Sequence, residues 1–430
     1  MTRKELLLSL KNSELLRNTS ILITGTAIAQ LIPFLLHLIF RRVYSTDIFG
    51  AYAFYMSLIG ILGAISCLKY ELAIILPHKD KDAANIFFLT VFINIVFNTL
   101  LIIVLIIWKT SILKFFNLSE KFSEYLFFVP LGIFFYSLYQ SINYWLIRKK
   151  GFLPISVNKF VRRGFEGFVQ VVFSFFRNSH AIIIGDFFGH FANIVSGLYQ
   201  GKKRGLSLSY LSRVKLKYVA SKYSEFPKLN VIPSLMSAIS FSLPVLLINK
   251  FYSVEITGFF DLSKLLLSLP LALIATSISN VLLQSITEKF KVNRSIKKDL
   301  LLILGIVGSI GALEILVISF SGVELFSLLY GKSNGFSGTI SKILVWSYAL
   351  SFIVASFSAV FIAMNKIKLL SIWQVFYFIS ILSLFLFKNL AFLDFLKVFV
   401  SIEVLCYLIS IIFMVYIVIN YERKLNLKVS

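Results

Sequence analysis

Charged residues are scarce in this chain of 430 residues: they make up 15% of it, against 58% hydrophobic residues. A soluble domain carries about 25% charged residues, so the composition excludes one and indicates a membrane protein. Cysteine is scarcer still, and both copies, Cys67 and Cys406, fall inside apolar runs, which argues against a disulfide framework. The sequence also lacks a phosphate-binding glycine loop and a spaced set of metal ligands. We therefore expect no cofactor, no bound metal and no ATP hydrolysis within this chain.

Long apolar runs are what the sequence does contain. A helix needs roughly 20 mostly apolar residues to cross a bilayer, and we find twelve such runs. They cover residues 19–40, 48–68, 83–108, 125–147, 155–176, 181–199, 230–249, 256–285, 299–320, 338–363, 369–387 and 393–420. The first run lacks a small-residue cleavage site and is too long for the apolar part of a signal peptide, so we expect it to be retained. The sequence thus predicts an all-α polytopic membrane protein with twelve transmembrane helices.

The net charge of +23 would suggest a nucleic-acid partner in a soluble protein, but here the distribution of the basic residues decides its meaning. Connections between twelve spans alternate between the two sides of a membrane. One set, which includes both termini, carries 31 of the 43 lysines and arginines, and the other set carries 11. Because cytoplasmic loops are enriched in these residues, we predict that both termini are cytoplasmic, and we expect no nucleic-acid partner.

The longest polar connection, residues 201–228, follows six spans and carries eight basic residues. It divides the chain into an N-terminal six-helix lobe at 1–210, a cytoplasmic linker at 211–229 and a C-terminal six-helix lobe at 230–430.

A short motif occurs once in each half, as RRVYSTDIFGAYAFY at 41–55 and NKFYSVEITGFFDLS at 249–263. The shared positions are Tyr44 and Tyr252, Ser45 and Ser253, Ile48 and Ile256, and Gly50 and Gly258. We expect each copy to be an outer turn whose glycine opens the next helix, with Asp47 or Glu255 stabilising the helix N-terminus. Six spans separate the copies, so the halves have the same orientation and form a parallel repeat. This predicts two pseudo-symmetric six-helix bundles around a central cavity.

The residues around both copies resemble a known family. The stretch LLRNTSILITGTAIAQLIPFLLHLIFRRVYSTDIFGAYAFYMSLIGILGAISCLKYELAIILP at 15–77 is similar to the Wzx-type polysaccharide repeat-unit flippases of the multidrug/oligosaccharidyl-lipid/polysaccharide exporter superfamily. The stretch at 222–281, with Tyr223, Phe226 and Pro227, resembles that family's seventh and eighth helices. The resemblance implies a bacterial inner-membrane protein that moves undecaprenyl-diphosphate-linked oligosaccharide to the outer leaflet for O-antigen, capsule or lipopolysaccharide synthesis. Its partners would be that lipid-linked substrate, membrane lipids and the polysaccharide polymerase machinery. Lipid II flippases of the same superfamily usually carry two further helices, which favours the polysaccharide branch.

Charges within the predicted spans are costly in a bilayer, so each needs a partner or a wet cavity. A fifth span that started after Arg163 would keep only 13 residues, so Arg162 and Arg163 are expected about 10–12 Å inside the cytoplasmic edge. They are candidates to bind an anionic head group, or they snorkel or pair with Glu166. Lys264 is expected at a similar depth below the outer edge. It either pairs with Asp261 or faces the central cavity and attracts diphosphate.

The motif also aligns Lys264 with Met56, so the scaffold common to both halves does not require this lysine. Arg42 and Lys250 correspond across the repeat and are further substrate-binding candidates, with interfacial anchoring as the alternative.

The sixth span places Asp186 and His190 four residues apart, beside Gly185 and Gly189. The glycines indicate tight helix packing. The Asp–His pair is a candidate for proton coupling, because histidine titrates near neutrality, and an interhelical structural hydrogen bond is the alternative. Glu314, a lone acid in the ninth span, is a third ion-coupling candidate with the same ambiguity.

Two other classes remain as alternatives. A membrane glycosyltransferase or O-antigen polymerase would need catalytic groups outside the membrane, but the largest outer segments, 109–124 and 321–338, hold no paired carboxylates or metal-ligand cluster. We therefore expect no enzyme. A drug/cation antiporter of the same superfamily would share the fold and should prefer acids in its cavity.

Overall fold

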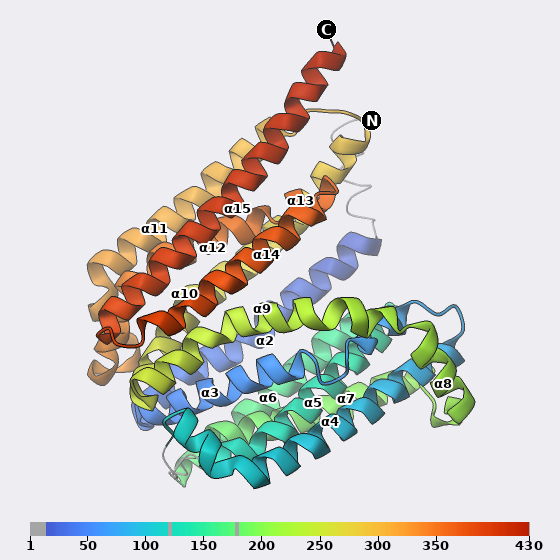
Figure 1. The fold of residues 1–430 in the computed structure, drawn as a ribbon, viewed down its shortest axis with the longest axis vertical. Coiled ribbons are helices and arrows are strands. Elements are labelled where there is room, and N and C mark those ends of the chain that lie inside the picture. The colour runs from blue at the N-terminus through green and yellow to red at the C-terminus, as the bar shows by residue number, and fades with distance from the viewer. Residues whose placement is uncertain (1–13, 119–122, 177–179, 430) are drawn as a thin grey trace. The chain divides into compact units, whose positions relative to one another are not determined.

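The structure, a computed structural model, describes residues 14–118, 123–176 and 180–429. The regular secondary structure of this part of the chain is entirely helical, and the described residues contain no strand (Figure 1). The first half contains α2 (Glu14–Val43), α3 (Thr46–Gly63), α4 (Asp80–Phe115), α5 (Ser123–Arg148), α6 (Phe152–Phe175), α7 (Ala181–Lys203) and α8 (Arg213–Lys222). The second contains α9 (Glu225–Phe251), α10 (Val254–Lys291), α11 (Lys297–Tyr330), α12 (Gly335–Phe357), α13 (Ala359–Ala363), α14 (Ile367–Leu382) and α15 (Phe392–Val429). Short 3₁₀ helices lie at Tyr70–Ile75, Leu208–Tyr210, Lys332–Asn334 and Ser383–Phe387. Residues 1–13 of the expected cytoplasmic N-terminus and 119–122 of the expected outer segment lie outside the described residues.

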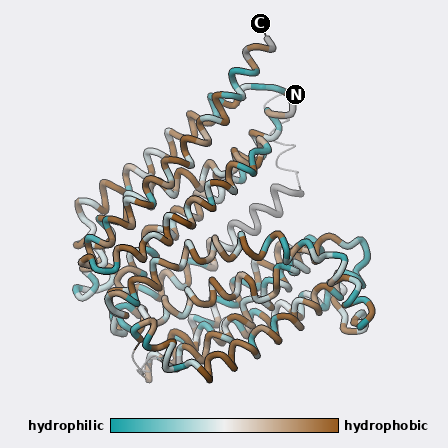
Figure 2. Tube along the Cα trace, viewed as in Figure 1, coloured by the Kyte–Doolittle hydropathy of each residue, from teal (hydrophilic) through white to brown (hydrophobic). Residues whose placement is uncertain are grey.

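The described residues contain eleven helices that are long and apolar enough to cross a membrane. The twelfth is α6, which is long enough at 24 residues but carries Lys159, Arg162, Arg163 and Glu166 near its middle. Hydrophobic residues run along the helices, and hydrophilic residues gather at their ends (Figure 2). Large apolar side chains face outward, as expected where lipid is the solvent. The prediction of a polytopic all-α protein with twelve spans is confirmed.

Helix packing recurs between the two halves in the order that the repeat predicts. In the first half α3 and α4 pack on α5, α5 packs on α7, and α6 packs on α7. The corresponding pairs of the second half, α10 and α11 on α12, α12 on α15, and α14 on α15, also pack together. Five helices of each bundle therefore pack in the same order, whereas the packing of α2 on α6 has no equally extensive counterpart between α9 and α14.

The two copies of the repeated motif have the same backbone conformation at the preceding helix end. Tyr44 N–H donates to Phe40 O at 2.9 Å, and Tyr252 N–H donates to Ile248 O at 3.0 Å. In each copy the serine after the tyrosine is the N-cap of the following helix, which begins at Thr46 or Val254. The acidic residues Asp47 and Glu255 lie in the first turn, as predicted.

The expectation that the glycines of the motif open the helix is wrong. Gly50 and Gly258 lie more than one turn inside α3 and α10. Serine takes the opening position because its hydroxyl can cap the first turn, and Ser253 Oγ accepts from Ile256 N at 3.0 Å.

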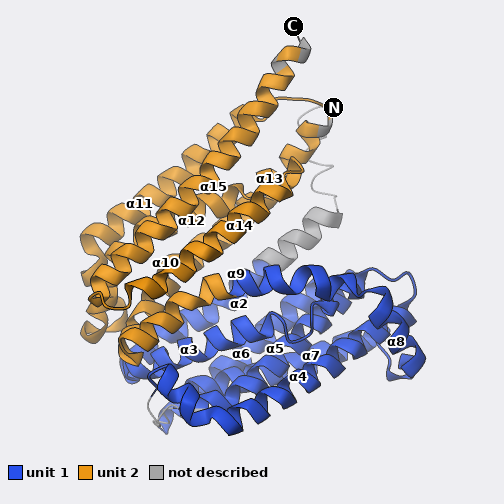
Figure 3. Cartoon of the chain, in the orientation of Figure 1, with its two compact units in different colours: residues 1–238 blue, residues 239–430 orange. Residues whose placement is uncertain are grey.

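The chain forms two compact units, residues 1–238 and 239–430, coloured blue and orange in Figure 3. The unit boundary lies inside α9, close to the end of the expected linker at 211–229. That linker is ordered over most of its length, because α8 packs on α4. Each unit has its own apolar core, represented by Trp145 and Ile142 in the first and by Phe361 and Leu282 in the second.

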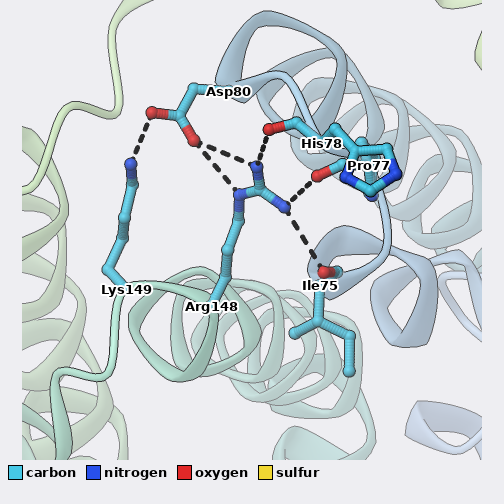
Figure 4. A network of polar contacts seen from close by, with 6 residues as sticks. All are labelled: Ile75, Pro77, His78, Asp80, Arg148 and Lys149. Carbon is cyan, nitrogen blue, oxygen red and sulfur yellow. Dashed lines mark hydrogen bonds and ion pairs between the residues drawn. The ribbon is translucent and has the colours of Figure 1, made fainter.

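Arg148, at the end of α5, fixes the connection between α3 and α4 (Figure 4). Its guanidinium donates to the carbonyl oxygens of Ile75, Pro77 and His78, and to Asp80 Oδ1 at 3.1 Å. Lys149 donates to the other oxygen of Asp80. These bonds satisfy carbonyl groups that the short 3₁₀ turn leaves without helical partners, and so they hold the start of α4 in place.

Candidate functional site

The first unit contains a cluster of buried charges on α6 and α7. Arg162 Nη2 donates to Asp186 Oδ1 at 3.2 Å. Arg163 Nη1 donates to both carboxylate oxygens of Glu166, at 2.8 and 3.1 Å. Asp186 and Glu166 are 0% and 5% exposed, and a buried carboxylate is tolerated only when it is paired. We call these four residues the α6–α7 ion pairs; each arginine has a carboxylate partner of its own.

Two glycines bring α6 and α7 close enough for these pairs to form. A Cβ on Gly189 would lie 2.6 Å from the Glu166 Cβ and 2.9 Å from the Arg162 carbonyl oxygen. A Cβ on Gly185 would lie 2.2 Å from the Gln170 Cγ. The tight packing predicted from these glycines is confirmed, and it places Asp186 on the face that meets α6.

Asp186 is also approached from α3 and from its own helix. Tyr55 Oη donates to Asp186 Oδ2 at 3.4 Å. His190 Nε2 lies 3.7 Å from Asp186 Oδ1, which is too long for a hydrogen bond. His190 is 1% exposed, and its Nδ1 has no hydrogen-bond partner among the described residues. The predicted Asp–His neighbours are therefore adjacent, but Arg162, rather than His190, is the bonded partner of the carboxylate.

The helix that carries Arg162 and Arg163 begins three residues before the expected start of the fifth span at 155. The helix α6 begins at Phe152, so both arginines lie near its middle, and Asp186 lies within two turns of the end of α7 that starts at Ala181. Tyr55, which bonds Asp186, is nine residues into α3, and Lys264 is ten residues into α10.

The second unit contains a cavity of about 230 Å³ between α9, α10, α12, α14 and α15. Lys264 and Glu403 are the charged residues among those that line it. Its other polar groups are hydroxyls, and they come from Ser240, Ser268, Ser347, Tyr348, Ser351, Tyr377 and Tyr407. Such a lining offers hydrogen bonds to a polar ligand and flat aromatic faces to a ring.

Glu403 is held by the tyrosines of the cavity. Tyr377 Oη donates to Glu403 Oε1 at 2.9 Å, and Tyr407 Oη donates to the same oxygen at 3.4 Å. The rings of Tyr377 and Tyr407 stack at 6.0 Å, and Trp373 stacks on Tyr377 at 5.4 Å. Glu403 is 8% exposed. A carboxylate this deeply buried is unfavourable in apolar surroundings, and the tyrosine hydrogen bonds stabilise it.

Lys264 lies in the same cavity with its ammonium over an aromatic ring. Its Nζ is 3.6 Å from the centroid of Phe241 and donates to the Phe241 carbonyl oxygen at 3.4 Å. Asp261 and Glu403 both attract this ammonium electrostatically. The sequence singled out Lys264 but did not combine it with Glu403 and the tyrosines, because these residues come from four different helices.

The remaining predicted site residues are placed as follows. Arg42 is exposed at the end of α2, and Lys250 is half-buried at the end of α9. Glu314 is half-buried in α11, and its Oε2 has no hydrogen-bond partner in the described part of the chain.

The sequence missed Arg41, which is 2% exposed with its guanidinium 3.7 Å from the centroid of Phe49. No spacing signal distinguished it from Arg42. Within the described ranges, no group of three or more His, Cys, Asp or Glu residues is arranged to hold a metal ion.

Known structures share this fold. The "Lipid II flippase MurJ, inward closed conformation" aligns over 94% of this chain and 91% of its own, with 14% identity and a TM-score of 0.67. A multidrug resistance MATE family transporter of the MOP superfamily, in an inward-facing conformation, aligns over 94% of both chains with 14% identity and a TM-score of 0.59. The eukaryotic MATE transporter AtDTX14 aligns over 96% of this chain and 99% of its own, with 16% identity and a TM-score of 0.59. No curated protein sequence matches the chain.

A sequence-family comparison is more specific than these structural similarities. The model of a family described as "Polysaccharide biosynthesis protein" matches residues 39–334. This range covers the repeated motif in both halves, the α6–α7 ion pairs and Lys264, and it ends before α12, α14 and α15. The chain therefore belongs to the polysaccharide biosynthesis protein family.

Proposed function

We propose that this protein is a flippase that translocates undecaprenyl-diphosphate-linked oligosaccharide repeat units across the bacterial inner membrane by alternating access, for O-antigen or capsule synthesis. The observation that carries the proposal is the family match over 39–334, in a chain whose fold is shared with a lipid II flippase. Membership in a polysaccharide biosynthesis family supports a cargo that contains a glycan, and the fold shared with a lipid II flippase supports a lipid-linked form of that glycan. Both termini are cytoplasmic, as the distribution of basic residues predicts.

The Lys264 cavity is our first candidate for contact with the cargo. A diphosphate cannot enter hydrocarbon without counter-charge, and an ammonium that already lies in a cavity can supply it. Serine and tyrosine hydroxyls beside it suit sugar hydroxyls. At about 230 Å³ the cavity has room for only part of the cargo, so the lipid tail would stay in the bilayer.

Arg162 and Arg163 take a secondary role in this proposal. Their carboxylate partners already neutralise them, and a diphosphate would have to displace Asp186 or Glu166 to bind. Arg42 and Lys250, near the repeated turn, remain candidates for guiding the anionic head group.

We propose that ion coupling uses buried carboxylates whose protonation changes their contacts. Protonation of Asp186 would free Arg162. His190 Nε2, which lies 3.7 Å from Asp186 Oδ1, would have to move closer to exchange this proton. Glu314 is the other candidate, since one of its carboxylate oxygens is buried without a hydrogen-bond donor among the described residues.

An exporter of organic cations is the alternative that a specific observation favours. Glu403 beside three tyrosine rings would suit a cation, and two of the similar structures are MATE transporters. The adjacent Lys264 opposes this alternative, because it repels a cation from the same cavity. A glycosyltransferase or polymerase is less favoured, and we propose that the protein is not an enzyme.

The test is genetic complementation with separate measurements of surface polysaccharide and protein level. A strain that lacks the gene should regain surface polysaccharide with the natural protein, while Lys264→Met should reduce it at normal protein abundance. A hydrogen bond to a charged group contributes about 1.5–3 kcal/mol, so the affinity for the cargo should fall roughly 10- to 100-fold. Normal polysaccharide display in the absence of the gene would refute the proposed function. Raised sensitivity to organic cations with unchanged polysaccharide would favour the antiporter.

A further inference from the structure

The helix α8 and the turn before it form a polar segment at one end of the first unit. With ten residues, α8 is too short to span a membrane. It runs across the ends of the bundle helices rather than alongside them (Figure 1). Because a helix that crosses a membrane ends near the lipid head groups, we expect α8 to lie at about that level.

One face of α8 is fixed to the bundle. Val219 is fully buried in the core of the first unit. Lys215 Nζ donates to Asp82 Oδ1 at 2.9 Å, and Tyr70 Oη donates to the Ala220 carbonyl oxygen at 2.8 Å. Asn85, on α4, holds the turn before α8: its amide donates to Tyr210 O at 2.7 Å, and its Oδ1 accepts from Ser212 N at 3.0 Å. The opposite face therefore has a defined orientation and cannot turn inward.

The opposite face is apolar at its centre. Val214 and Tyr218 lie four residues apart and so share one side of α8. They are 80% and 53% exposed, and Leu208 and Leu211 in the preceding turn are 77% and 50% exposed. Four large apolar side chains on a segment that water would surround are costly unless something covers them.

Basic residues flank this apolar strip on both sides. Arg213 and Lys217 lie along one edge and Lys222 along the other, and all three are exposed. Between residues 201 and 228 the chain has eight Lys or Arg residues and one acid, Glu225. Lys222 donates to Tyr218 Oη at 3.2 Å, and this bond raises the pKa of its ammonium, which stays charged at neutral pH.

We propose that the exposed face of α8 docks on the anionic phospholipid surface of the membrane beside the bundle. Apolar side chains that enter the head-group layer, with cations on both flanks, are the pattern of an interfacial helix. The lipid surface also adjoins the membrane-spanning helices to which α8 is bonded. Docking would hold the linker at 211–229, which connects the two units, at a fixed depth relative to the membrane surface. The proposal is independent of the cargo.

The experiment uses the full-length protein in nanodiscs. Val214→Cys is labelled with an environment-sensitive fluorophore; the native Cys67 and Cys406 are buried, so labelling is selective. Nanodiscs contain phosphatidylcholine alone or a mixture with phosphatidylglycerol, and a nitroxide on the lipid acyl chains quenches a label that enters the bilayer. We expect strong quenching with phosphatidylglycerol and weak quenching without it.

Charge reversal tests the electrostatic part. A basic residue at an anionic surface contributes roughly a fivefold change in binding. Replacing Arg213, Lys217 and Lys222 by Glu should therefore shift the docked-to-undocked ratio by at least roughly 100-fold and abolish quenching. The matched control changes exposed basic residues of the second unit, Lys298, Lys366 and Lys368, to Glu, and quenching should persist.

Three results would overturn the proposal. The label could remain in water in both lipid mixtures, it could be quenched equally in both, or quenching could survive charge reversal in α8. Shielding of the label only after a soluble cytosolic protein is added would show that this face binds protein instead of lipid. Each outcome leaves the proposed transport function untouched, because polysaccharide display is measured separately.

Discussion

The ion pair between Arg162 and Asp186 leads to a prediction that separates structure from transport. Asp186 is fully buried, and the Arg162 side chain is 14% exposed. Removing one partner of a buried pair leaves the other charge uncompensated and costs about 3–5 kcal/mol. We expect Arg162→Gln and Asp186→Asn each to destabilise the protein by about this amount. Both remove the same contact, so the double variant should lose about 3 kcal/mol less than the sum of the single losses.

The assay is equilibrium unfolding in mixed micelles, followed by tryptophan fluorescence, for the natural protein, both single variants and the double variant. Asp394 and Lys397 provide the control, because their side chains are 57% and 64% exposed and their pair should couple by less than about 1 kcal/mol. Additive losses for Arg162→Gln and Asp186→Asn would refute the reasoning. A folded double variant that still displays polysaccharide would assign Arg162 to structure, whereas a folded variant without display would assign it to transport.

Three further predictions concern packing, the α4 start and the second cavity. Gly189→Leu should separate α6 from α7 and reduce the amount of folded protein in the membrane, because even a Cβ at this position would lie 2.6 Å from the Glu166 Cβ. Immunoblots of membranes measure the protein level, and a normal level would contradict the prediction. Arg148→Met should destabilise the protein by about 2–4 kcal/mol, since it leaves Asp80 and three carbonyl groups with fewer donors (Figure 4). An unchanged unfolding midpoint would contradict a stabilising role for these bonds. Glu403→Gln should preserve the tyrosine hydrogen bonds yet change transport, and identical transport rates would remove Glu403 from the candidate site.

The fold was largely predictable because its signal is local. Each span is identifiable from a run of roughly 20 apolar residues. The repeat is identifiable from a motif that has the same residue type at corresponding positions, such as Tyr44 and Tyr252. The predicted helix starts were less accurate, since a Ser N-cap and a glycine five residues later both suit the beginning of a helix. The structure decides for Ser45 and Ser253.

The candidate site was only partly predictable, because its geometry depends on helix rotation and on partners from distant spans. Sequence spacing favoured contacts within one helix, and it correctly suggested Glu166 as a partner of Arg163. It could not identify Asp186 as the partner of Arg162, since the two lie on different helices. It also could not bring Lys264 into one cavity with Glu403. Charged residues in spans identify candidates, and tertiary packing decides which of them meet.

The central claim, movement of a lipid-linked glycan across a bilayer, is tested most directly in proteoliposomes. Purified protein is reconstituted with fluorescent undecaprenyl-diphosphate oligosaccharide, and the fraction of glycan accessible to an external lectin is followed over time. We expect the accessible fraction to change faster with the natural protein than in protein-free liposomes. Lys264→Met should slow the change, and organic cations should not compete. A rate equal to that of protein-free liposomes, from protein that is folded and moves an organic cation in the same vesicles, would contradict it.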